Sequence, residues 1–189
     1  VKELANLIDA DRFELLTKKD FSVEDIDFEE TGDTLEENAT IKAIELKKLL
    51  EDRNENIEGA WILADDTGLF VAALNGQPGV YSSRYAGENV TYEDNVNKLL
   101  YEMSGIEEEK RTAYFETVIV LLRDGKINTF NGRVNGSILD EKRGESGFGY
   151  DPVFYVTDKN KTLAEMSLEE KNQISHRAAA YGKLAEYLM

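Results

Sequence analysis

Two adjacent carboxylates that follow an apolar run are the strongest candidates for chemistry in this sequence. Trp61–Ala64 predicts a short buried strand, and Asp65, Asp66, Thr67 and Gly68 come directly after it. We expect the strand to present both carboxylates at its end, with Gly68 allowing a sharp turn. Buried carboxylates are costly unless they are compensated, and a divalent cation compensates them. An acidic β-turn is the competing interpretation of this pattern.

A second acidic group, Asp27–Gly32, contains Glu29 and Glu30. Taken alone it is a solvated charge run. If it lies close to Asp65 and Asp66 in space, it completes a magnesium site. Magnesium takes one or two protein carboxylates and fills its remaining positions with water and phosphate oxygens.

The candidate basic residues belong to a strongly acidic chain. The formal net charge is −16 and the pI is about 4.5, which repels nucleic acid, anionic membranes and triphosphates alike. A nucleotide site in this chain must therefore be locally basic or contain a metal. Each candidate alone is more often a surface charge, but together they supply such a field: Lys42, Arg84, Lys171, Arg177 and His176, the only histidine.

Two aromatic residues lie among glycines in the segment Gly147–Pro152. Glycines let a backbone approach a flat ligand closely, and Phe148 or Tyr150 then has a ring to stack on a nucleic base. The competing interpretation is a turn that leads into a strand and carries two core aromatics.

Several elements are expected to position these residues. Thr34 and Glu37 form a capping box that starts a helix running to about Glu51. The remaining expected elements are a helix over Val1–Ile8, a short strand over Phe13–Thr17, a helix over Thr91–Met103, a hairpin of Thr112–Arg123 and Lys126–Val134 around Asp124-Gly125, and a strand over Tyr150–Val156.

The C-terminal segment requires a break. Ser167 and Glu170 form a second capping box. In one continuous helix at about 100° per residue, Lys171 and the His176-Arg177 pair would point apart. We therefore expect a break at Ser175 and a new final helix, whose apolar face uses Tyr181, Leu184 and Leu188.

The composition indicates a soluble globular protein with an α/β fold. Hydrophobic residues make up 41% of the 189 residues, charged residues make up 32%, and cysteine is absent. Disulfides and thiolate metal sites are thereby excluded, and a reducing cytoplasm fits. No apolar run is long enough to span a membrane, and no signal peptide is recognisable. Strands alternate with helices around an antiparallel hairpin, which predicts a mixed, twisted sheet without a safe domain boundary.

Five ordered segments resemble the inosine/xanthosine triphosphate pyrophosphatase family, the Ham1-like enzymes that act on non-standard purine nucleotides. The resemblance covers the chain nearly end to end. The matching segments are Thr31–Ala39, Ala64–Leu69, Leu74–Tyr85, Gly147–Pro152 and Glu170–Arg177.

The resemblance implies an elongated, mixed-sheet α/β fold flanked by helices, with a single domain over residues 1–189, two lobes around a central substrate cleft, and a homodimer. It implies hydrolysis of ITP, dITP and XTP to the monophosphate and pyrophosphate, with Mg²⁺ as cofactor. No nucleic acid or membrane is implied as a partner.

The resemblance also implies roles for individual residues. Asp66 matches a proton acceptor and metal ligand, with Asp65 as its partner, and Glu30, or alternatively Glu29, matches the second magnesium ligand. Thr67 stands where the family has a substrate-contacting serine. Lys42 and Arg84 match basic positions near the phosphates, and the nucleoside-binding positions are Phe148, Gly149, Tyr150, Asp151, Lys171, His176 and Arg177.

One departure from the family concerns the N-terminus. The family opens with a strand and a phosphate loop of the type Thr/Ser-x-x-Asn-x-x-Lys, ahead of the helix that matches Val1–Ile8. Both are missing from the 189 residues, so we expect the natural protein to begin upstream of Val1.

Two rival functions are compatible with the same residues. One is a house-cleaning pyrophosphatase for modified pyrimidine or methylated nucleotides, which a substrate panel separates from a purine enzyme. The other is a nucleotide-binding module without turnover, which an assay of pyrophosphate release excludes or supports.

Overall fold

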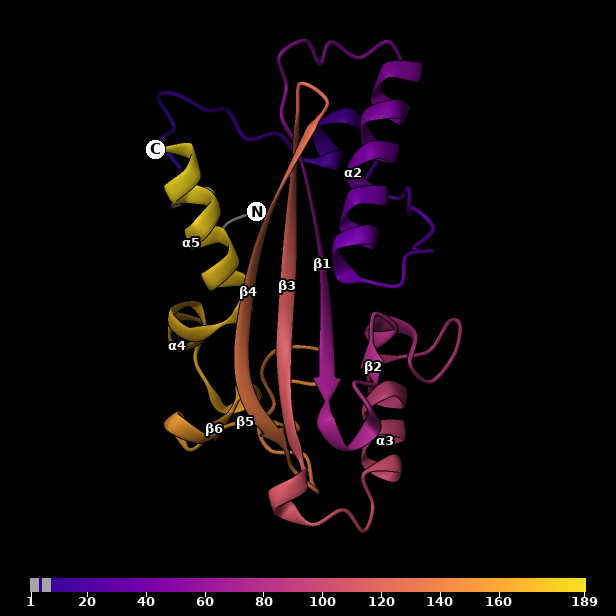
Figure 1. The fold of residues 1–189 in the computed structure, drawn as a ribbon, viewed down its shortest axis with the longest axis vertical. Helices are drawn as coiled ribbons and strands as arrows, with labels where there is room; N and C mark the ends of the chain where they lie inside the picture. The colour runs from indigo at the N-terminus through magenta and orange to yellow at the C-terminus, as the bar shows by residue number, and fades with distance from the viewer. Residues whose placement is uncertain (1–3, 5–7) are drawn as a thin grey trace. The chain divides into compact units, whose positions relative to one another are not determined.

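The computed structural model describes residue 4 and residues 8–189 (Figure 1). The helices are α2 (Leu35–Asp52), α3 (Tyr92–Glu102), α4 (Leu168–Ile174) and α5 (His176–Leu188). The strands are β1 (Ile62–Val71), β2 (Pro78–Gly79), β3 (Thr112–Arg123), β4 (Lys126–Ile138), β5 (Phe154–Val156) and β6 (Lys161–Thr162). Short 3₁₀ helices cover Lys18–Phe21, Ala72–Leu74, Ser82–Arg84, Glu108–Lys110, Thr157–Lys159 and Leu163–Glu165.

The strands form a six-stranded sheet in the order β2-β1-β3-β4-β5-β6. The pairs β1–β2, β4–β5 and β5–β6 are antiparallel, and β3 and β4 follow one another through the predicted Asp124-Gly125 turn, where both residues have positive φ. The expected α/β class, a sheet flanked by helices, is confirmed.

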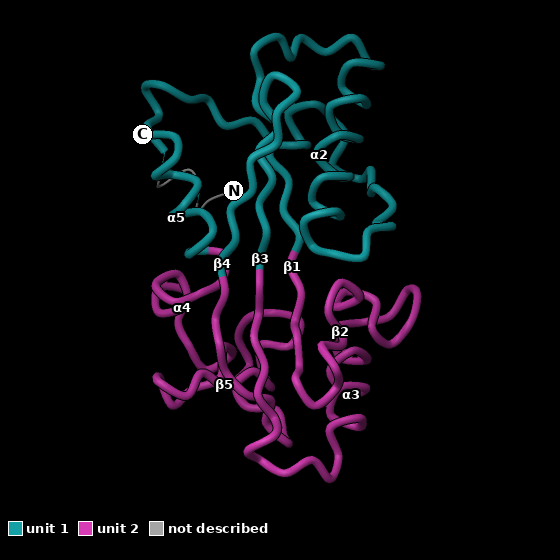
Figure 2. The backbone as a smooth tube through the Cα atoms, viewed as in Figure 1, with its two compact units in different colours: residues 1–66, 117–132, 178–189 teal, residues 67–116, 133–177 magenta. Residues whose placement is uncertain are grey.

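The chain divides into two compact units, coloured separately in Figure 2. Unit 1 comprises residues 1–66, 117–132 and 178–189, and unit 2 comprises residues 67–116 and 133–177. Strands β1, β3 and β4 each contribute residues to both units.

In unit 1 the sheet is covered by α2 on one face and by α5 on the other (Figure 1). Successive residues of a strand point to opposite faces. Val120 and Leu122 of β3 therefore pack with Ala39 and Ala43 of α2. The intervening residues of β3 pack on the other side with α5, and this cluster contains Ile119, Leu121, Ala180 and Leu184.

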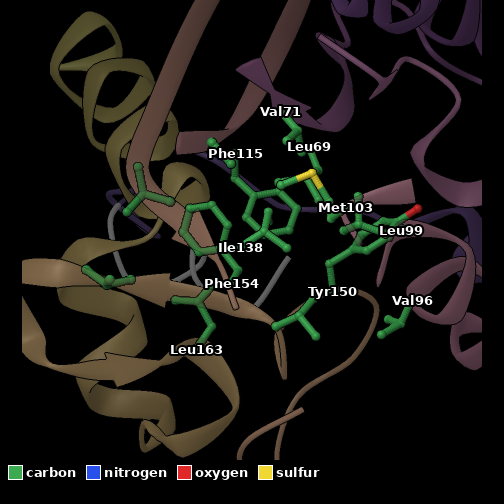
Figure 3. Close-up of a cluster of buried hydrophobic side chains, with 14 of the residues drawn as sticks. Leu69, Val71, Val96, Leu99, Met103, Phe115, Ile138, Tyr150, Phe154 and Leu163 are labelled. Atoms are coloured by element: carbon green, nitrogen blue, oxygen red, sulfur yellow. The ribbon is translucent and has the colours of Figure 1, made fainter. Parts of the chain in front are cut away.

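Unit 2 has its own core, in which the strands pack against α3 and against the segment that precedes β5 (Figure 3). Leu99 and Met103 of α3 are fully buried. They share this core with buried residues from β1, β3, β4 and β5, among them Leu69, Val71, Phe115, Ile138 and Phe154.

The predicted helix starts are confirmed. Thr34 Oγ1 accepts the N–H of Glu37 at 3.1 Å, and Glu37 Oε2 accepts the N–H of Thr34 at 3.0 Å. Thr91 and Ser167 cap α3 and α4 in the same way. Ser175 is extended, with φ −69° and ψ 153°, so the chain breaks between α4 and α5 as the spacing requires.

Strand β1 corrects the expected end of the apolar run, because it continues through Asp65 and Asp66 to Val71. Gly68 is therefore part of a strand rather than of a turn. A Cβ on Gly68 would lie 2.6 Å from the carbonyl oxygen of Gly79, so the absence of a side chain permits the pairing of β1 with β2. The carboxylates are thus presented from the middle of a strand.

Two further predictions of secondary structure differ from the structure. Phe13–Thr17 forms no strand, although the Phe13 ring packs against Trp61 at 5.3 Å between centroids. The strand expected from Tyr150 begins only at Phe154, because Tyr150 lies in a turn. The helix expected over Val1–Ile8 falls largely outside the described residues. No helix in the described part of the chain is long and apolar enough to cross a membrane.

Candidate functional site

Unit 1 gathers Glu30, Asn38, Lys42 and Asp66 into what we term the carboxylate–lysine cluster. The ammonium group of Lys42 lies 2.7 Å from Asp66 Oδ1 and 3.1 Å from Glu30 Oε1. Only 9% of the Asp66 side chain is exposed, against 22% for each of the other two charged side chains. Because the charges are largely removed from water, solvent screens their attraction less than it would at the surface.

Helix α2 positions this cluster. Asn38 and Lys42 are four residues apart and therefore lie on the same helix face. Asn38 is fully buried, and its Nδ2 donates to Asp66 Oδ2 at 3.4 Å. Its Oδ1 accepts the N–H of Gly32 at 2.8 Å. One amide side chain thereby links Asp66 to the segment that carries Glu30.

The electrostatics favour a charged lysine and a more basic aspartate. Burial raises the pKa of the Asp66 carboxyl above its usual range, although Lys42 opposes this shift. Burial disfavours the charged form of Lys42, but the hydrogen bonds and negative charges of Asp66 and Glu30 outweigh it, so the pKa of Lys42 is raised. Asp66 is consequently a better proton acceptor than an exposed carboxylate.

The two neighbouring aspartates differ in their surroundings. Ile62 and Ala64 pack with α2, whereas Trp61 and Leu63 belong to the cluster around α5. By the alternation of a strand, Asp66 lies on the α2 face and Asp65 on the opposite face. The strand therefore brings only one of the two predicted catalytic carboxylates to Lys42.

The two glutamates of the second acidic segment differ in their surroundings. Glu30 is half-buried and pairs with Lys42, whereas Glu29 is exposed. Of the two alternatives for the second metal ligand, the geometry supports Glu30.

The carboxylate pair fits magnesium. An oxygen of Glu30 and an oxygen of Asp66 already converge on one cation, the Lys42 ammonium group. Within the described residues no group of three or more His, Asp or Glu side chains is placed to hold a metal. Two carboxylates match the number of protein ligands that magnesium commonly uses, with water and phosphate oxygens completing its shell.

Unit 2 gathers the second set of predicted residues, Phe148, Asp151, Lys171, His176 and Arg177, which we term the aromatic–basic cluster. Lys171 Nζ lies 2.6 Å from Asp151 Oδ2, and the N–H of Phe148 donates to the same oxygen at 3.2 Å. The buried Asp151 carboxylate therefore ties the glycine-flanked loop to α4.

Gly147 is required by this arrangement. Its φ is +86°, a region that favours glycine. A Cβ at Gly147 would lie 2.1 Å from Asp151 Oδ2 and 2.6 Å from Lys171 Nζ. The loop can approach the Lys171–Asp151 ion pair only because this side chain is missing.

His176 is buried, with 7% of its surface exposed. Its ring stacks on Phe115 at 4.9 Å between centroids and 19° between planes. Its Nδ1 atom is buried and, within the described part of the chain, has no hydrogen-bond partner. Burial, and then the positive charges of Arg177 and Lys171, lower the pKa of His176 to about 3. The imidazole is therefore neutral at physiological pH.

The two aromatics of the glycine-flanked loop have different surroundings. Phe148 is 57% exposed, and the Arg177 guanidinium lies 5.8 Å from the centroid of its ring. Tyr150 is 4% exposed, belongs to the core of unit 2, and donates its hydroxyl to the carbonyl of Ser82 at 2.9 Å. Phe148 is thus available to stack on a base, whereas Tyr150 has a covered ring.

The remaining predicted residues also have defined places. Arg84 ends the 3₁₀ helix Ser82–Arg84 and lies 5.2 Å from the centroid of the Tyr81 ring. Thr67 is half-buried in β1. Gly149 adopts a φ of +59° beside Phe148.

Sequence reasoning missed three residues that touch these clusters. Asn38 contacts Asp66, Phe115 stacks on His176, and the exposed ring of Tyr92 lies 6.1 Å from that of Phe148. Asn38 was recognisable in principle, because it stands one helical turn before Lys42 on the same face. Phe115 and Tyr92 are brought to their partners by tertiary structure, and no local pattern marks them.

Known proteins resemble this chain over its full length. The sequence profile of the Ham1 family matches residues 1–187. The dITP/XTP pyrophosphatase of Thermoanaerobacter sp. (strain X514) is 52% identical over 188 residues, which cover 100% of this chain and 90% of that protein. The dITP/XTP pyrophosphatase of Geobacter sulfurreducens is 46% identical over 192 residues, with the same coverage.

A solved structure supports the fold. The Ham1 protein of Staphylococcus aureus superposes with a TM-score of 0.86 at 41% identity, covering 100% of this chain and 92% of that one. The strand and phosphate loop expected ahead of Val1 stay a prediction, since the structure describes no residue there.

Proposed function

Because the chain belongs to the Ham1 family, we propose that it hydrolyses non-standard purine nucleoside triphosphates, such as dITP, ITP and XTP, to the monophosphate and pyrophosphate. The relatives that carry the name dITP/XTP pyrophosphatase support this activity. The observation in the chain itself that carries it is the convergence of Glu30 and Asp66 on a single positive charge, which is the arrangement a metal–triphosphate complex needs.

The carboxylate–lysine cluster performs the phosphate chemistry. Phosphoryl transfer depends on positioning and on neutralising charge. Magnesium, when bound by Glu30 and Asp66, supplies positive charge to the phosphates. Asp66 accepts a proton from the attacking water, and burial raises its pKa toward that role. Asn38 holds Asp66 in place through its second carboxylate oxygen.

The aromatic–basic cluster recognises the base. Phe148 stacks on the purine ring, since its own ring is exposed. Hypoxanthine and xanthine present an acceptor at position 6, where adenine presents a donor. Arg177, with its five N–H groups, donates to such an acceptor. The Nδ1 of His176 is buried and has no partner within the described residues, so a ligand atom bonds to it only after the residues that cover it move. A site built on such polar contacts discriminates strongly between bases.

The proposal also includes the metal, the oligomeric state and the cellular location of the protein. Magnesium is supported by the number and type of oxygen ligands in the carboxylate–lysine cluster. A homodimer is supported by the family resemblance, and light scattering of the purified protein tests it. We propose a cytoplasmic location because the absence of cysteine fits a reducing compartment.

A substrate panel tests the proposed function. Purified protein is incubated with Mg²⁺ and, separately, with ITP, XTP, dUTP, 5-methyl-dCTP, ATP and GTP, and released pyrophosphate is measured. We expect turnover of ITP and XTP that exceeds turnover of ATP by orders of magnitude, as polar recognition allows, about 10⁴-fold. Preferred turnover of dUTP or 5-methyl-dCTP would reassign the substrate class. Binding of ITP without pyrophosphate release would reduce the protein to a nucleotide-binding module.

A further inference from the structure

Lys42 holds an unusual position for a phosphate-binding lysine, because it is bound to both carboxylates that are proposed to hold the metal. Its ammonium group contacts Asp66 Oδ1 and Glu30 Oε1 at 2.7 and 3.1 Å. Neither carboxylate is fully exposed, and Asn38 fixes Asp66 from the other side. The lysine is therefore the resident cation of this site.

A divalent cation that binds the same two oxygens meets a direct competitor. Magnesium requires its ligand oxygens at 2.0–2.1 Å in a near-octahedral shell. An ammonium group within hydrogen-bonding distance of both oxygens occupies lone pairs that the metal needs, and it repels the metal by its charge. Lys42 and a metal that uses Glu30 Oε1 and Asp66 Oδ1 therefore compete for the same two oxygens.

We propose that Lys42 is an internal counter-cation that holds the Glu30–Asp66 pair together until a divalent cation displaces its ammonium group, which then becomes available to the triphosphate. The inference rests on the proposed function and names a regulation of the same site. Displacement couples the two ligands, because metal binding releases a phosphate-binding group. By linkage, the triphosphate in turn favours the metal. The site exchanges one cation for another, so a positive charge stays beside Glu30 and Asp66 throughout.

A purely structural ion pair predicts the opposite response to mutation. If Lys42 only holds the carboxylates in place, its removal lets Glu30 and Asp66 move apart, and metal binding weakens or stays the same. If Lys42 competes, its removal strengthens metal binding. The sign of the change therefore separates the two roles.

The test measures metal binding without nucleotide. Free Mn²⁺ is titrated by electron paramagnetic resonance against the wild-type protein, Lys42→Met and Lys42→Gln. The Gln variant keeps a neutral donor for the carboxylates and guards against loss of folding in the Met variant. We expect both to bind Mn²⁺ more tightly, by about 5–150-fold, the range of coupled sites. Unchanged or weaker binding in the folded variants overturns the proposal.

Lys47→Met is the matched control. Lys47 lies on the same helix and pairs with Glu51 at 2.8 Å, with 44% of its side chain exposed. The substitution removes the same charge from α2 without touching Glu30 or Asp66. We expect its Mn²⁺ affinity to stay within about twofold of the wild type, because exposed charges are screened. An equal gain in Lys47→Met would assign the effect to net charge and overturn the competition.

A second measurement uses the unmodified protein. N-acetoxysuccinimide acetylates accessible amines, and mass spectrometry gives the ratio of labelled Lys42 to labelled Lys47 with and without Mg²⁺. We expect Mg²⁺ to raise this ratio, and an unchanged or lower ratio overturns the proposal. Neither measurement requires turnover. If ITP yields no pyrophosphate but Lys42 is displaced, only the proposed function fails. If ITP is cleaved but Lys42 does not compete, only this inference fails.

Discussion

The carboxylate–lysine cluster and the aromatic–basic cluster differ in how completely their polar atoms are satisfied. In unit 1, Lys42 pairs with both Glu30 and Asp66, and Asn38 bonds to the remaining oxygen of Asp66. In unit 2, the buried Nδ1 of His176 has no hydrogen-bond partner among the described residues, and Phe148 presents more than half of its surface to solvent. We call the carboxylate–lysine cluster balanced, because its charged groups pair with one another. We call the aromatic–basic cluster incomplete, because a buried ring nitrogen has no partner among the described residues.

This difference indicates two modes of ligand binding. A balanced cluster must exchange partners before it binds a ligand, so its affinity depends on what the ligand displaces. An incomplete cluster bears the cost of an unpaired buried group in the free protein, of about 1–3 kcal/mol, and recovers it when a ligand supplies the bond. Under the proposed function, phosphates would therefore bind by exchanging partners in the carboxylate–lysine cluster, and a base would bind by adding contacts in the aromatic–basic cluster.

Replacing Asp66 by Asn removes a negative charge from the carboxylate–lysine cluster and has the largest expected effect. The amide cannot accept a proton and does not attract a cation, so turnover of ITP should fall by about 10²–10⁴-fold, the usual contribution of a general base. Pyrophosphate release at saturating ITP and Mg²⁺ measures it. Asp65→Asn is the matched comparison, since Asp65 lies on the opposite face of β1, and its loss should be much smaller. Equal losses would contradict the assignment of proton transfer to Asp66 alone.

Replacing Phe148 by Ala removes the exposed ring of the aromatic–basic cluster and has an intermediate expected effect. Stacking of a base on an aromatic ring contributes about 1–3 kcal/mol. The KM for ITP should therefore rise by about 5–150-fold, with a smaller change in kcat. Tyr101→Ala is the control, because Tyr101 is 82% exposed on α3 of the same unit. A KM that does not move in Phe148→Ala would remove stacking from the proposed recognition.

The sequence predicts those parts of the two clusters that depend on local patterns. The Thr34–Glu37 capping box and the break at Ser175 were predictable, because capping and helical periodicity involve residues a few positions apart. The same local rules predicted the hairpin around Asp124-Gly125.

Other features depend on tertiary pairing. An acidic pair after an apolar run predicts a strand end, yet β1 continues to Val71, because β2 pairs with its second half. This continuation is what separates Asp65 from Asp66. The distinction between Phe148 and Tyr150 also lies beyond the local pattern, since only the packed core shows which ring is covered. The same holds for the stacking of Phe115 on His176.

The pH dependence of stability tests the aromatic–basic cluster in the free protein. The pKa of His176 is about 3 in the folded state and about 6.5 in an unfolded chain. Phe115 packs on the ring, and the charges of Arg177 and Lys171 oppose its protonation. Above pH 6.5 His176 is neutral in both states. As the pH falls from about 6.5 to 3, only the unfolded chain binds the proton, so the folded state loses about 1.4 kcal/mol per pH unit.

Replacing His176 by Phe removes this titration and keeps a ring to pack on Phe115. The free energy of unfolding, measured with urea at pH 7, 6, 5 and 4, should therefore fall less steeply in His176→Phe than in the wild type, by about 1.4 kcal/mol per pH unit below pH 6. The comparison cancels the carboxylates, which titrate in both proteins. Parallel slopes would mean that His176 takes up a proton in the folded state as readily as in the unfolded one. The imidazole of His176 would then be solvated in the folded protein, and its Nδ1 would not be an unsatisfied buried atom.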